Sequence, residues 1–114
     1  MLVRRISSSF LFAALVAALA PGCGGLESDC VEVCEDSKAC PDGNKNENCN
    51  ANCALLADAA EHTGCEDEVA AIIECSRTDV CNQTTNCDAV TDAYGTCKLA
   101  FCTANPHDSG CIVN

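Results

Sequence analysis

The sequence predicts an all-α fold, a small disulfide-stapled bundle of about four helices in two α-hairpins, preceded by a signal peptide. The first observation is the abundance of cysteine, with 13 in a chain of 114 residues, which is typical of a disulfide scaffold. The second is the spacing of these cysteines, which places pairs of them on one helical face. The third is that apolar residues recur at intervals of three and four, without any long strand-like alternation.

Residues 1–22 are predicted to be a signal peptide. Two arginines precede an apolar run over residues 10–20. This run is shorter than the roughly 20 residues that cross a bilayer as a helix, but it fits the apolar region of a secretory signal. Cleavage after Ala20 would leave Pro21 first, whose locked φ and missing N–H suit a peptidase poorly. The other small-residue site follows Gly22. Ordinary secretion and a mitochondrial presequence are the alternatives.

Cys23 is predicted to be lipidated. The stretch around Gly22 and Cys23 resembles the lipobox of bacterial lipoproteins, in which the cysteine thiol is acylated and becomes the new N-terminus. The cysteine count gives independent support, because removing Cys23 from thirteen leaves twelve that can pair fully. The alternative is a free or intermolecular thiol. Residues 23–27 would form a short glycine tether. The resemblance implies the outer rather than the inner membrane, since Gly24 follows the cysteine.

Residues 28–114 are expected to form one disulfide-rich helical domain. All seventeen acidic residues follow the leader, against four basic ones, which gives the mature chain a net charge of −13. Such a surface excludes nucleic-acid binding and disfavours adhesion to anionic lipids. Solubility explains this charge, and attraction of a basic partner is the alternative.

The hydrophobic core of this domain is expected to be thin. Tyr94 and Phe101 are its only aromatic residues, and alanine is abundant. A chain of this size would be marginally stable on burial alone, whereas each disulfide adds about 2–4 kcal/mol. Such bridges form in an oxidising compartment outside the cytoplasm.

Twelve cysteines are candidates for disulfides, and most of them fall into two symmetrical patterns, first with pairs that have three residues between them and then with pairs that have nine. They are Cys30, Cys34, Cys40, Cys49, Cys53, Cys65, Cys75, Cys81, Cys87, Cys97, Cys102 and Cys111. Antiparallel helices bring inner cysteines to inner and outer to outer. The predicted bonds join Cys30 with Cys53, Cys34 with Cys49, Cys65 with Cys97, and Cys75 with Cys87. The other four are left to pair among themselves.

These spacings resemble the twin CX3C and twin CX9C helical hairpins of small mitochondrial intermembrane-space proteins. The resemblance covers residues 30–97 and concerns cysteine spacing alone. It implies a shared way of stapling helices rather than a shared function.

The first two helices follow from start and stop signals. Asp29 with Glu32 gives a capping-box start, and the turn at 41–43 ends the first helix. The second is expected to begin near Asn44 and to end at Gly64. Its buried stripe is formed by Cys49, Cys53, Leu56 and Ala60.

The third and fourth helices complete the bundle. The third starts near residues 63–65, and its early acids and late Arg77 suit the helix dipole. Its buried face comprises Val69, Ile72 and Ile73. The fourth carries an apolar seam of Cys87, Val90, Tyr94, Cys97 and Phe101. It ends at Asn105, before Pro106, and Cys111 is expected to pin the tail.

No metal or cofactor is expected. The cysteine pairs with three residues between them have the spacing of zinc knuckles, but an export signal and an even number of remaining cysteines favour disulfides. Residues 42–46 begin like a calcium loop, yet Glu47 and Cys53 stand where such a loop needs Gly and Glu. A turn is the favoured interpretation.

No catalytic site is expected either. Asp58 and His62 have the spacing of a base and its orienting group on a helix, but a histidine in a last turn usually complements the dipole. His107, Asp108 and Ser109 are too close in sequence to form a triad. A hydrolase that uses either histidine is therefore a disfavoured hypothesis.

The expected function is that of a non-catalytic module with a structural or binding role at the cell envelope. Its partners would be the membrane, through the lipid on Cys23, and an unidentified protein. The alternative is a freely secreted, extracellular ligand carrier or inhibitor-like effector, because small stapled helices can enclose a lipid-sized cavity.

Overall fold

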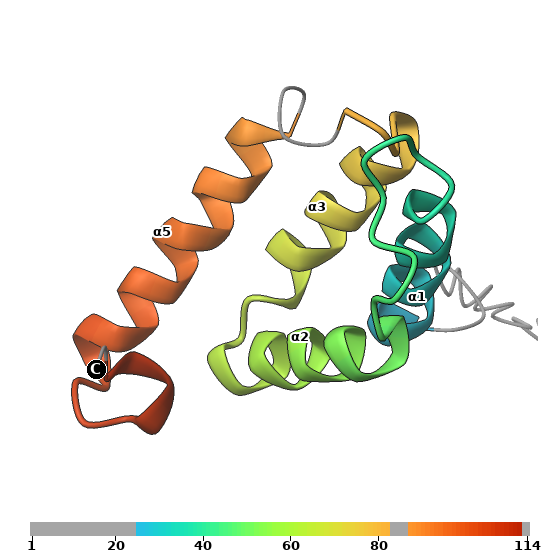
Figure 1. Cartoon of the computed structure of the whole chain (residues 1–114). Helices are drawn as coiled ribbons and strands as arrows, with labels where there is room; N and C mark the ends of the chain where they lie inside the picture. Colours follow the sequence, from blue (N-terminus) through green and yellow to red (C-terminus); the bar gives the residue numbers. More distant parts are fainter. Residues whose placement is uncertain (1–24, 83–86, 113–114) are drawn as a thin grey trace, which may run out of the picture.

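The computed structural model describes residues 25–82 and 87–112 (Figure 1). That part of the chain contains helices and no strand, which confirms the predicted all-α, disulfide-stapled bundle. The helices are α1 (Gly25–Ser37), α2 (Cys49–Thr63), α3 (Glu66–Thr78), α5 (Asp88–Ala104) and the short 3₁₀ helix η1 (Ser109–Cys111). The predicted signal peptide and Cys23 lie outside the described residues.

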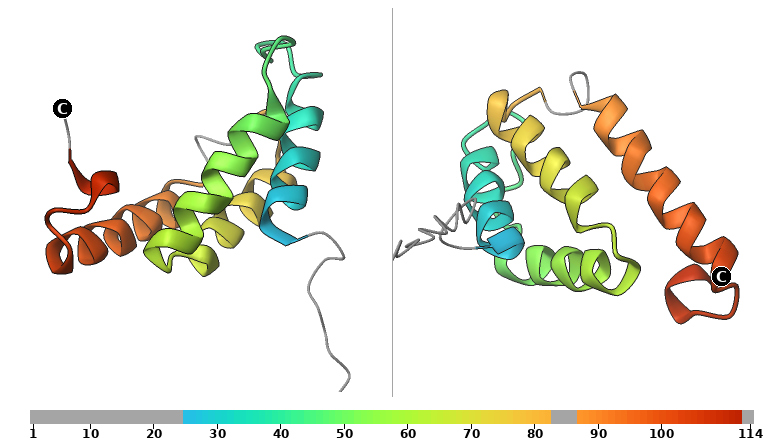
Figure 2. Two further views of the ribbon diagram at one scale, coloured as in Figure 1. Left: turned by 90° about the horizontal axis from the view of Figure 1, so that it is seen from below. Right: turned by 180° about the vertical axis from the view of Figure 1, so that it is seen from behind.

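The helices form two antiparallel hairpins, which we call the first hairpin (α1 and α2) and the second hairpin (α3 and α5). Helix α1 packs against both α2 and α3, whereas α5 packs mainly against α3. Figures 1 and 2 show α5 running beside α3 on the side away from α1. The first hairpin and α3 therefore form the body, and α5 lies along one edge of it.

Helix α1 begins at Gly25, so the predicted start at Asp29 is wrong by four residues. Residues 25–27, which the sequence assigned to a tether, are its first turn. The carboxylates of Asp29 and Glu32 do not cap the helix, because they lie 3.4 Å and 3.6 Å from the guanidinium of Arg77 on α3. The apparent capping box is thus an inter-helix ion cluster.

The turn after α1 requires glycine at position 43. A Cβ added to Gly43 would overlap the carbonyl oxygen of Ser37 and lie 2.8 Å from that of Lys38. The amide of Gly43 donates to the carbonyl of Cys40 at 2.9 Å. The predicted stop at 41–43 is therefore a close approach of the chain to the end of α1.

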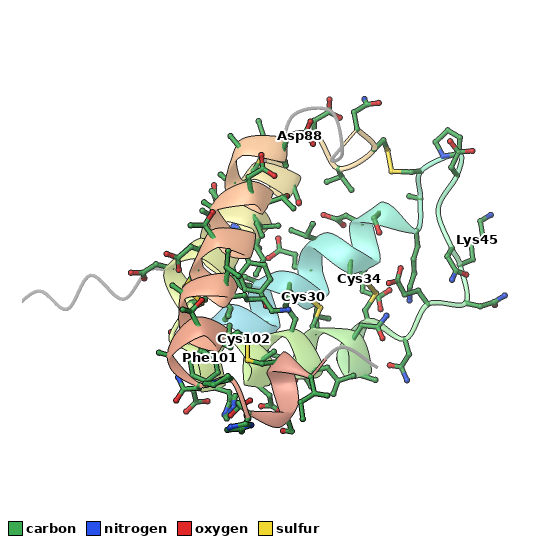
Figure 3. The ribbon with its side chains drawn as sticks, turned by 90° about the vertical axis from the view of Figure 1, so that its left-hand side faces the viewer. Cys30, Cys34, Lys45, Asp88, Phe101 and Cys102 are labelled. Atoms are coloured by element: carbon green, nitrogen blue, oxygen red, sulfur yellow. A yellow bond between two sulfur atoms is a disulfide. The ribbon has the colours of Figure 1, made fainter. Side chains whose placement is uncertain are left out.

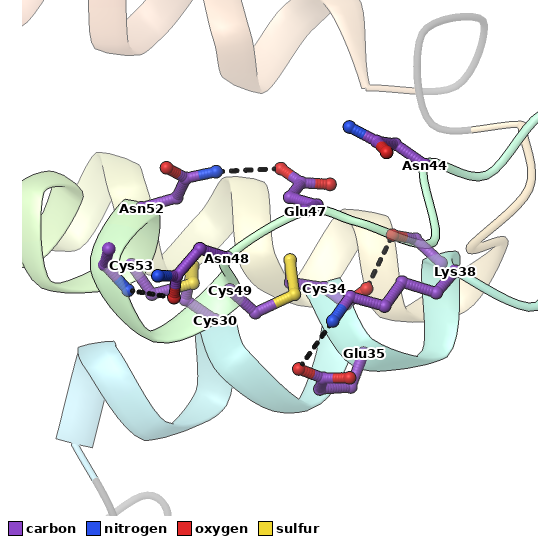
Figure 4. Close-up of a disulfide and its surroundings, with 12 residues drawn as sticks. Cys30, Cys34, Glu35, Lys38, Asn44, Glu47, Asn48, Cys49, Asn52 and Cys53 are labelled. Atoms are coloured by element: carbon purple, nitrogen blue, oxygen red, sulfur yellow. Dashed lines mark hydrogen bonds and ion pairs between the residues drawn. A yellow bond between two sulfur atoms is a disulfide. The ribbon is translucent and has the colours of Figure 1, made fainter.

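Helix α2 begins at Cys49 rather than near Asn44. The side chain of Asn44 accepts from the amide of Asn46 at 3.1 Å, and this local turn competes with helix formation. The cap is Asn48, whose side chain accepts from the amide of Ala51 at 3.1 Å (Figure 4). The predicted end is confirmed, since Gly64 follows with a left-handed φ of 69°.

The second hairpin follows the predicted pattern. Cys65 precedes α3, and Val69 and Ile73 are buried while Ile72 is half-buried. On α5 the predicted seam faces the body, but its helical members are only half-buried. The helix closes where the amide of Asn105 donates to the carbonyl of Phe101 at 2.9 Å.

Cysteine supplies much of the core. The central cluster consists of Val33, Ala60, Val69 and Ile73. Of the eight buried apolar residues in the described part of the chain, four are disulfide-bonded cysteines, namely Cys49, Cys53, Cys65 and Cys87. No residue of α5 itself is buried. Bridges therefore hold this helix more than apolar contact does.

All twelve cysteines of the described residues are paired in six disulfides. The four predicted pairings are confirmed: Cys30 with Cys53, Cys34 with Cys49, Cys65 with Cys97, and Cys75 with Cys87. The remaining cysteines join Cys40 with Cys81 and Cys102 with Cys111. Figure 4 shows the two bridges of the first hairpin, one helical turn apart.

The bond between Cys40 and Cys81 differs from the others in what it connects. Two bridges lie within each hairpin, and Cys102 with Cys111 closes the tail. Cys40 follows α1 and Cys81 follows α3, so among the six disulfides theirs alone joins the two hairpins. It also spans the largest sequence separation, 41 residues.

Candidate functional site

The predicted lipidation residue, Cys23, lies outside the described part of the chain. The pairing of the other cysteines still bears on its role. The sequence has 13 cysteines, and the six bridges use the twelve that follow Cys23. Helix α1 begins two residues later, at Gly25.

The structure brings His62 to Asp108, a pair that the sequence did not predict. The imidazole Nε2 of His62, in the last turn of α2, lies 2.8 Å from Oδ2 of Asp108 in the tail. The ring also meets Phe101 of α5 edge-on, with centroids 5.4 Å apart. Figure 3 shows Phe101 and Cys102 together at the end of α5. Three separate segments therefore converge at this point.

Asp108 is held as a carboxylate. Its Oδ1 accepts from the amide of Gly110 at 2.9 Å, which caps the short helix η1. This backbone hydrogen bond lowers the pKa of Asp108 below its ordinary value, and the hydrogen bond from His62 lowers it further. The residue thus acts as both a helix cap and the partner of a ring nitrogen.

The pairing of His62 with Asp58, which the sequence disfavoured, is replaced by a contact of the ring nitrogen Nε2 with Asp108. A histidine and a carboxylate in contact are two parts of an acyl-transfer triad. Within residues 25–82 and 87–112, no hydrogen bond joins Ser109 or His107 to the His62 ring. The bridge of Cys102 to Cys111 was the one signal for this site, because it returns the tail to the end of α5.

The cysteines considered as zinc ligands are bonded to one another. In the described part of the chain, Cys65, Glu68 and Cys97 form a group close enough to hold an ion. However, Cys65 and Cys97 share a disulfide, so neither presents a thiolate.

The calcium-like segment 42–46 forms a turn. Its Asn44 oxygen is engaged by the amide of Asn46, and the carboxylate of the following Glu47 accepts from Asn52 at 3.0 Å (Figure 4). Both oxygens therefore accept hydrogen bonds within the turn that leads into α2. A hollow of about 340 Å³ beside this turn reaches Cys40 and Cys81.

A second hollow, which we call the α1–α3 groove, has a volume of about 410 Å³. We call its apolar lining residues the floor, namely Leu26, Ala70 and Ile73. We call its acidic lining residues the rim, namely Asp29, Glu66, Asp67 and Glu74. A smaller hollow of about 240 Å³ lies on the same body, between α1, α2 and α3.

Arg77 also lines the α1–α3 groove. Its guanidinium lies 3.4 Å from Asp29, 3.6 Å from Glu32 and 3.5 Å from Glu74. The sequence assigned Arg77 to the helix dipole alone. Its three carboxylate partners mean that it joins α1 to α3 as well, although each exposed pair contributes about 0.2–1 kcal/mol.

No family model, curated protein or solved structure matches this chain. Within the described residues, no helix is long and apolar enough to cross a membrane.

Proposed function

We propose that the chain is an exported, lipid-anchored, non-catalytic module with a structural or binding role at the cell envelope. The observation that carries this proposal is the complete pairing of the twelve downstream cysteines, which leaves Cys23 over. An odd cysteine in an exported chain needs a role, and its place after an apolar leader supports acylation. Six bridges also favour an oxidising compartment.

The short link to α1 supports a body held close to the membrane. Gly25 lies two positions after Cys23, and two residue steps span at most about 7 Å when extended. The mature surface carries a net charge of −13 and is repelled by anionic headgroups. The acyl chains would therefore supply the membrane affinity, and the protein surface would be turned toward soluble or periplasmic partners.

A non-catalytic role is supported by the way in which His62 is used. Its ring packs on Phe101 and its Nε2 meets a carboxylate that already caps η1. These contacts connect α2, α5 and the tail. His62 and Asp108 therefore have a structural role in holding these segments together.

Intact mass spectrometry of the protein purified from the envelope tests the proposal. We expect an acylated N-terminal Cys23, together with a rise of about 12 Da on reduction, two hydrogens for each bridge. The control is Cys23→Ser, which should lose the acyl mass and leave the membrane fraction while keeping the six bridges. A native protein with a free, unmodified Cys23 thiol would overturn the proposal.

The second candidate is the same stapled body released into the medium. It is favoured by the small residues at positions 18 and 20, which fit cleavage after Ala20. The N-terminal residue of the mature chain separates the two, since it is Pro21 after ordinary cleavage and an acylated Cys23 after lipoprotein processing.

A further inference from the structure

The α1–α3 groove combines an apolar floor with free negative charge. Ile73 is 6% exposed and belongs to the core cluster, and Leu26 packs against that cluster. Two of the three floor residues thus belong to the core or pack against it, and the third, Ala70, is exposed. An aliphatic side chain placed on it would contact packed protein below.

The acidic rim is only partly neutralised. Asp29 and Glu74 share the guanidinium of Arg77. Glu66 and Asp67, in the first turn of α3, have no ion-pair partner among the described residues. Four rim carboxylates against one guanidinium leave a local charge of −3.

We propose that the α1–α3 groove docks a basic, amphipathic segment of a partner protein, with an aliphatic side chain on Ala70 and lysine or arginine beside Glu66 and Asp67. Charge complementarity selects this occupant, because an acidic or purely apolar segment would leave the rim unpaired. The pattern of an apolar anchor flanked by cations suits a short helix laid in a groove. This inference deepens the proposed binding role and rests on it.

The groove adjoins the predicted anchor. Gly25 lines it and lies two residues after Cys23. A partner docked there would be held beside the membrane surface. A basic segment suits that position, since cations are attracted to anionic headgroups that the rest of the domain repels.

The test uses the mature oxidised protein and a blocked synthetic peptide, KLLKKLLKKLLK, titrated by calorimetry at physiological ionic strength. We expect saturable binding to this probe and at least about fivefold weaker binding of the equally charged KSSKKSSKKSSK, which lacks the anchor. Equal binding of the two peptides would overturn the proposal, because it would show charge attraction without a groove.

Two variants locate the binding. The double change E66Q/D67N should weaken the leucine peptide about fivefold, as expected for two exposed ion pairs. Its matched control is D88N/D92N, which removes two acids from the start of α5 and should change affinity less than about twofold. Ala70→Arg should abolish binding by filling the floor, whereas Ala93→Arg on α5 should not. An equal loss in both members of either comparison would overturn the assignment to this groove.

Other occupants give different results. A stable dimer that Ala70→Arg dissociates would assign the groove to a second copy of the chain. Tighter competition by a synthetic peptide of residues 1–22 than by the probe would assign it to the leader. Acylated Cys23 with no peptide binding would overturn the groove alone and leave the envelope role standing.

Discussion

The Nε2 atom of His62 lies 2.8 Å from Oδ2 of Asp108, which joins the end of α2 to the tail across 46 residues of sequence. The bridge of Cys102 to Cys111 brings the tail back, and the ring of Phe101 fills the space beside the imidazole. The tail is therefore held by one covalent bond and one polar pair. Because the polar pair contains a carboxylate, the attachment depends on pH.

Acidification should release this polar attachment. The pKa of Asp108 is lowered by the Gly110 amide and by His62, so its stabilisation is fully present above about 3.9, the ordinary value for aspartate, and is lost as the pH falls through the lowered value. The NMR shift of the Gly110 amide proton should follow this titration with a midpoint below about 3.9. In His62→Asn the midpoint should rise only partly, since the Gly110 amide is the larger cause. A native midpoint above the ordinary value would contradict the prediction.

Limited reduction should open the bond between Cys40 and Cys81 first. Cys81 is exposed and the bond lies in loops, whereas both hairpins have a buried cysteine in each of their bridges. Thiol–disulfide exchange requires access of the attacking thiolate to a sulfur. Brief treatment with dithiothreitol, trapping with iodoacetamide and peptide mapping should show Cys40 and Cys81 labelled earliest.

The variant C40S/C81S is the control for this experiment. It should lack the early-labelled fraction and retain five bridges. Early labelling of Cys49 or Cys65, both of them buried, would show that accessibility does not set the order of reduction.

Helix α5 should detach when its two bridges are removed. It contributes no buried residue, so the changes C65A/C97A and C75A/C87A together should remove most of its hold on α3. Hydrogen exchange read by mass spectrometry should show loss of protection over residues 88–104, with α1 and α2 still protected. The double change C102A/C111A should free the tail alone. Retained protection of α5 in the quadruple variant would contradict this prediction, because it would show that the half-buried apolar seam alone holds α5 against α3.

Two glycines should respond oppositely to alanine. Gly43→Ala places a Cβ against the carbonyls of Ser37 and Lys38, and should destabilise the fold by about 1–3 kcal/mol. Gly95→Ala adds a Cβ in open space within α5, and should stabilise that helix by about 0.5–1 kcal/mol. Guanidinium unfolding of the oxidised proteins measures both changes. The same sign for both substitutions would refute the described turn at Gly43.

Four of the six cysteine pairings could be predicted from helical periodicity, whereas those of Cys40 with Cys81 and of Cys102 with Cys111 lie outside the helical pairs and were left open. Residues four or ten apart share a face or a side of a helix, and antiparallel packing then permits one matching order. The end of a helix could be predicted where the backbone requires a particular residue, as at Gly64, whose left-handed φ ends α2. The start of α1 could not be predicted from Asp29 and Glu32, because these acids serve Arg77 on another helix.

The contacts that shape the two candidate sites could not be predicted from the sequence either, because they also depend on tertiary packing. His62 and Asp108 meet because the bond between Cys102 and Cys111, at a sequence separation of 9, returns the tail to α5, and no local pattern predicts the direction of such a loop. The α1–α3 groove likewise depends on how the two hairpins dock. Periodicity determines which face of a helix is apolar, but not which apolar residues remain uncovered at the edge of that contact.

The order in which the chain acquires its bridges follows from the position of Cys40 and Cys81. The bonds within each hairpin close spans of 12–32 residues and need only their own two helices. The bond of Cys40 to Cys81 needs the ends of α1 and α3 to be neighbours already. We therefore expect this disulfide to form last, after both hairpins have folded and packed against each other.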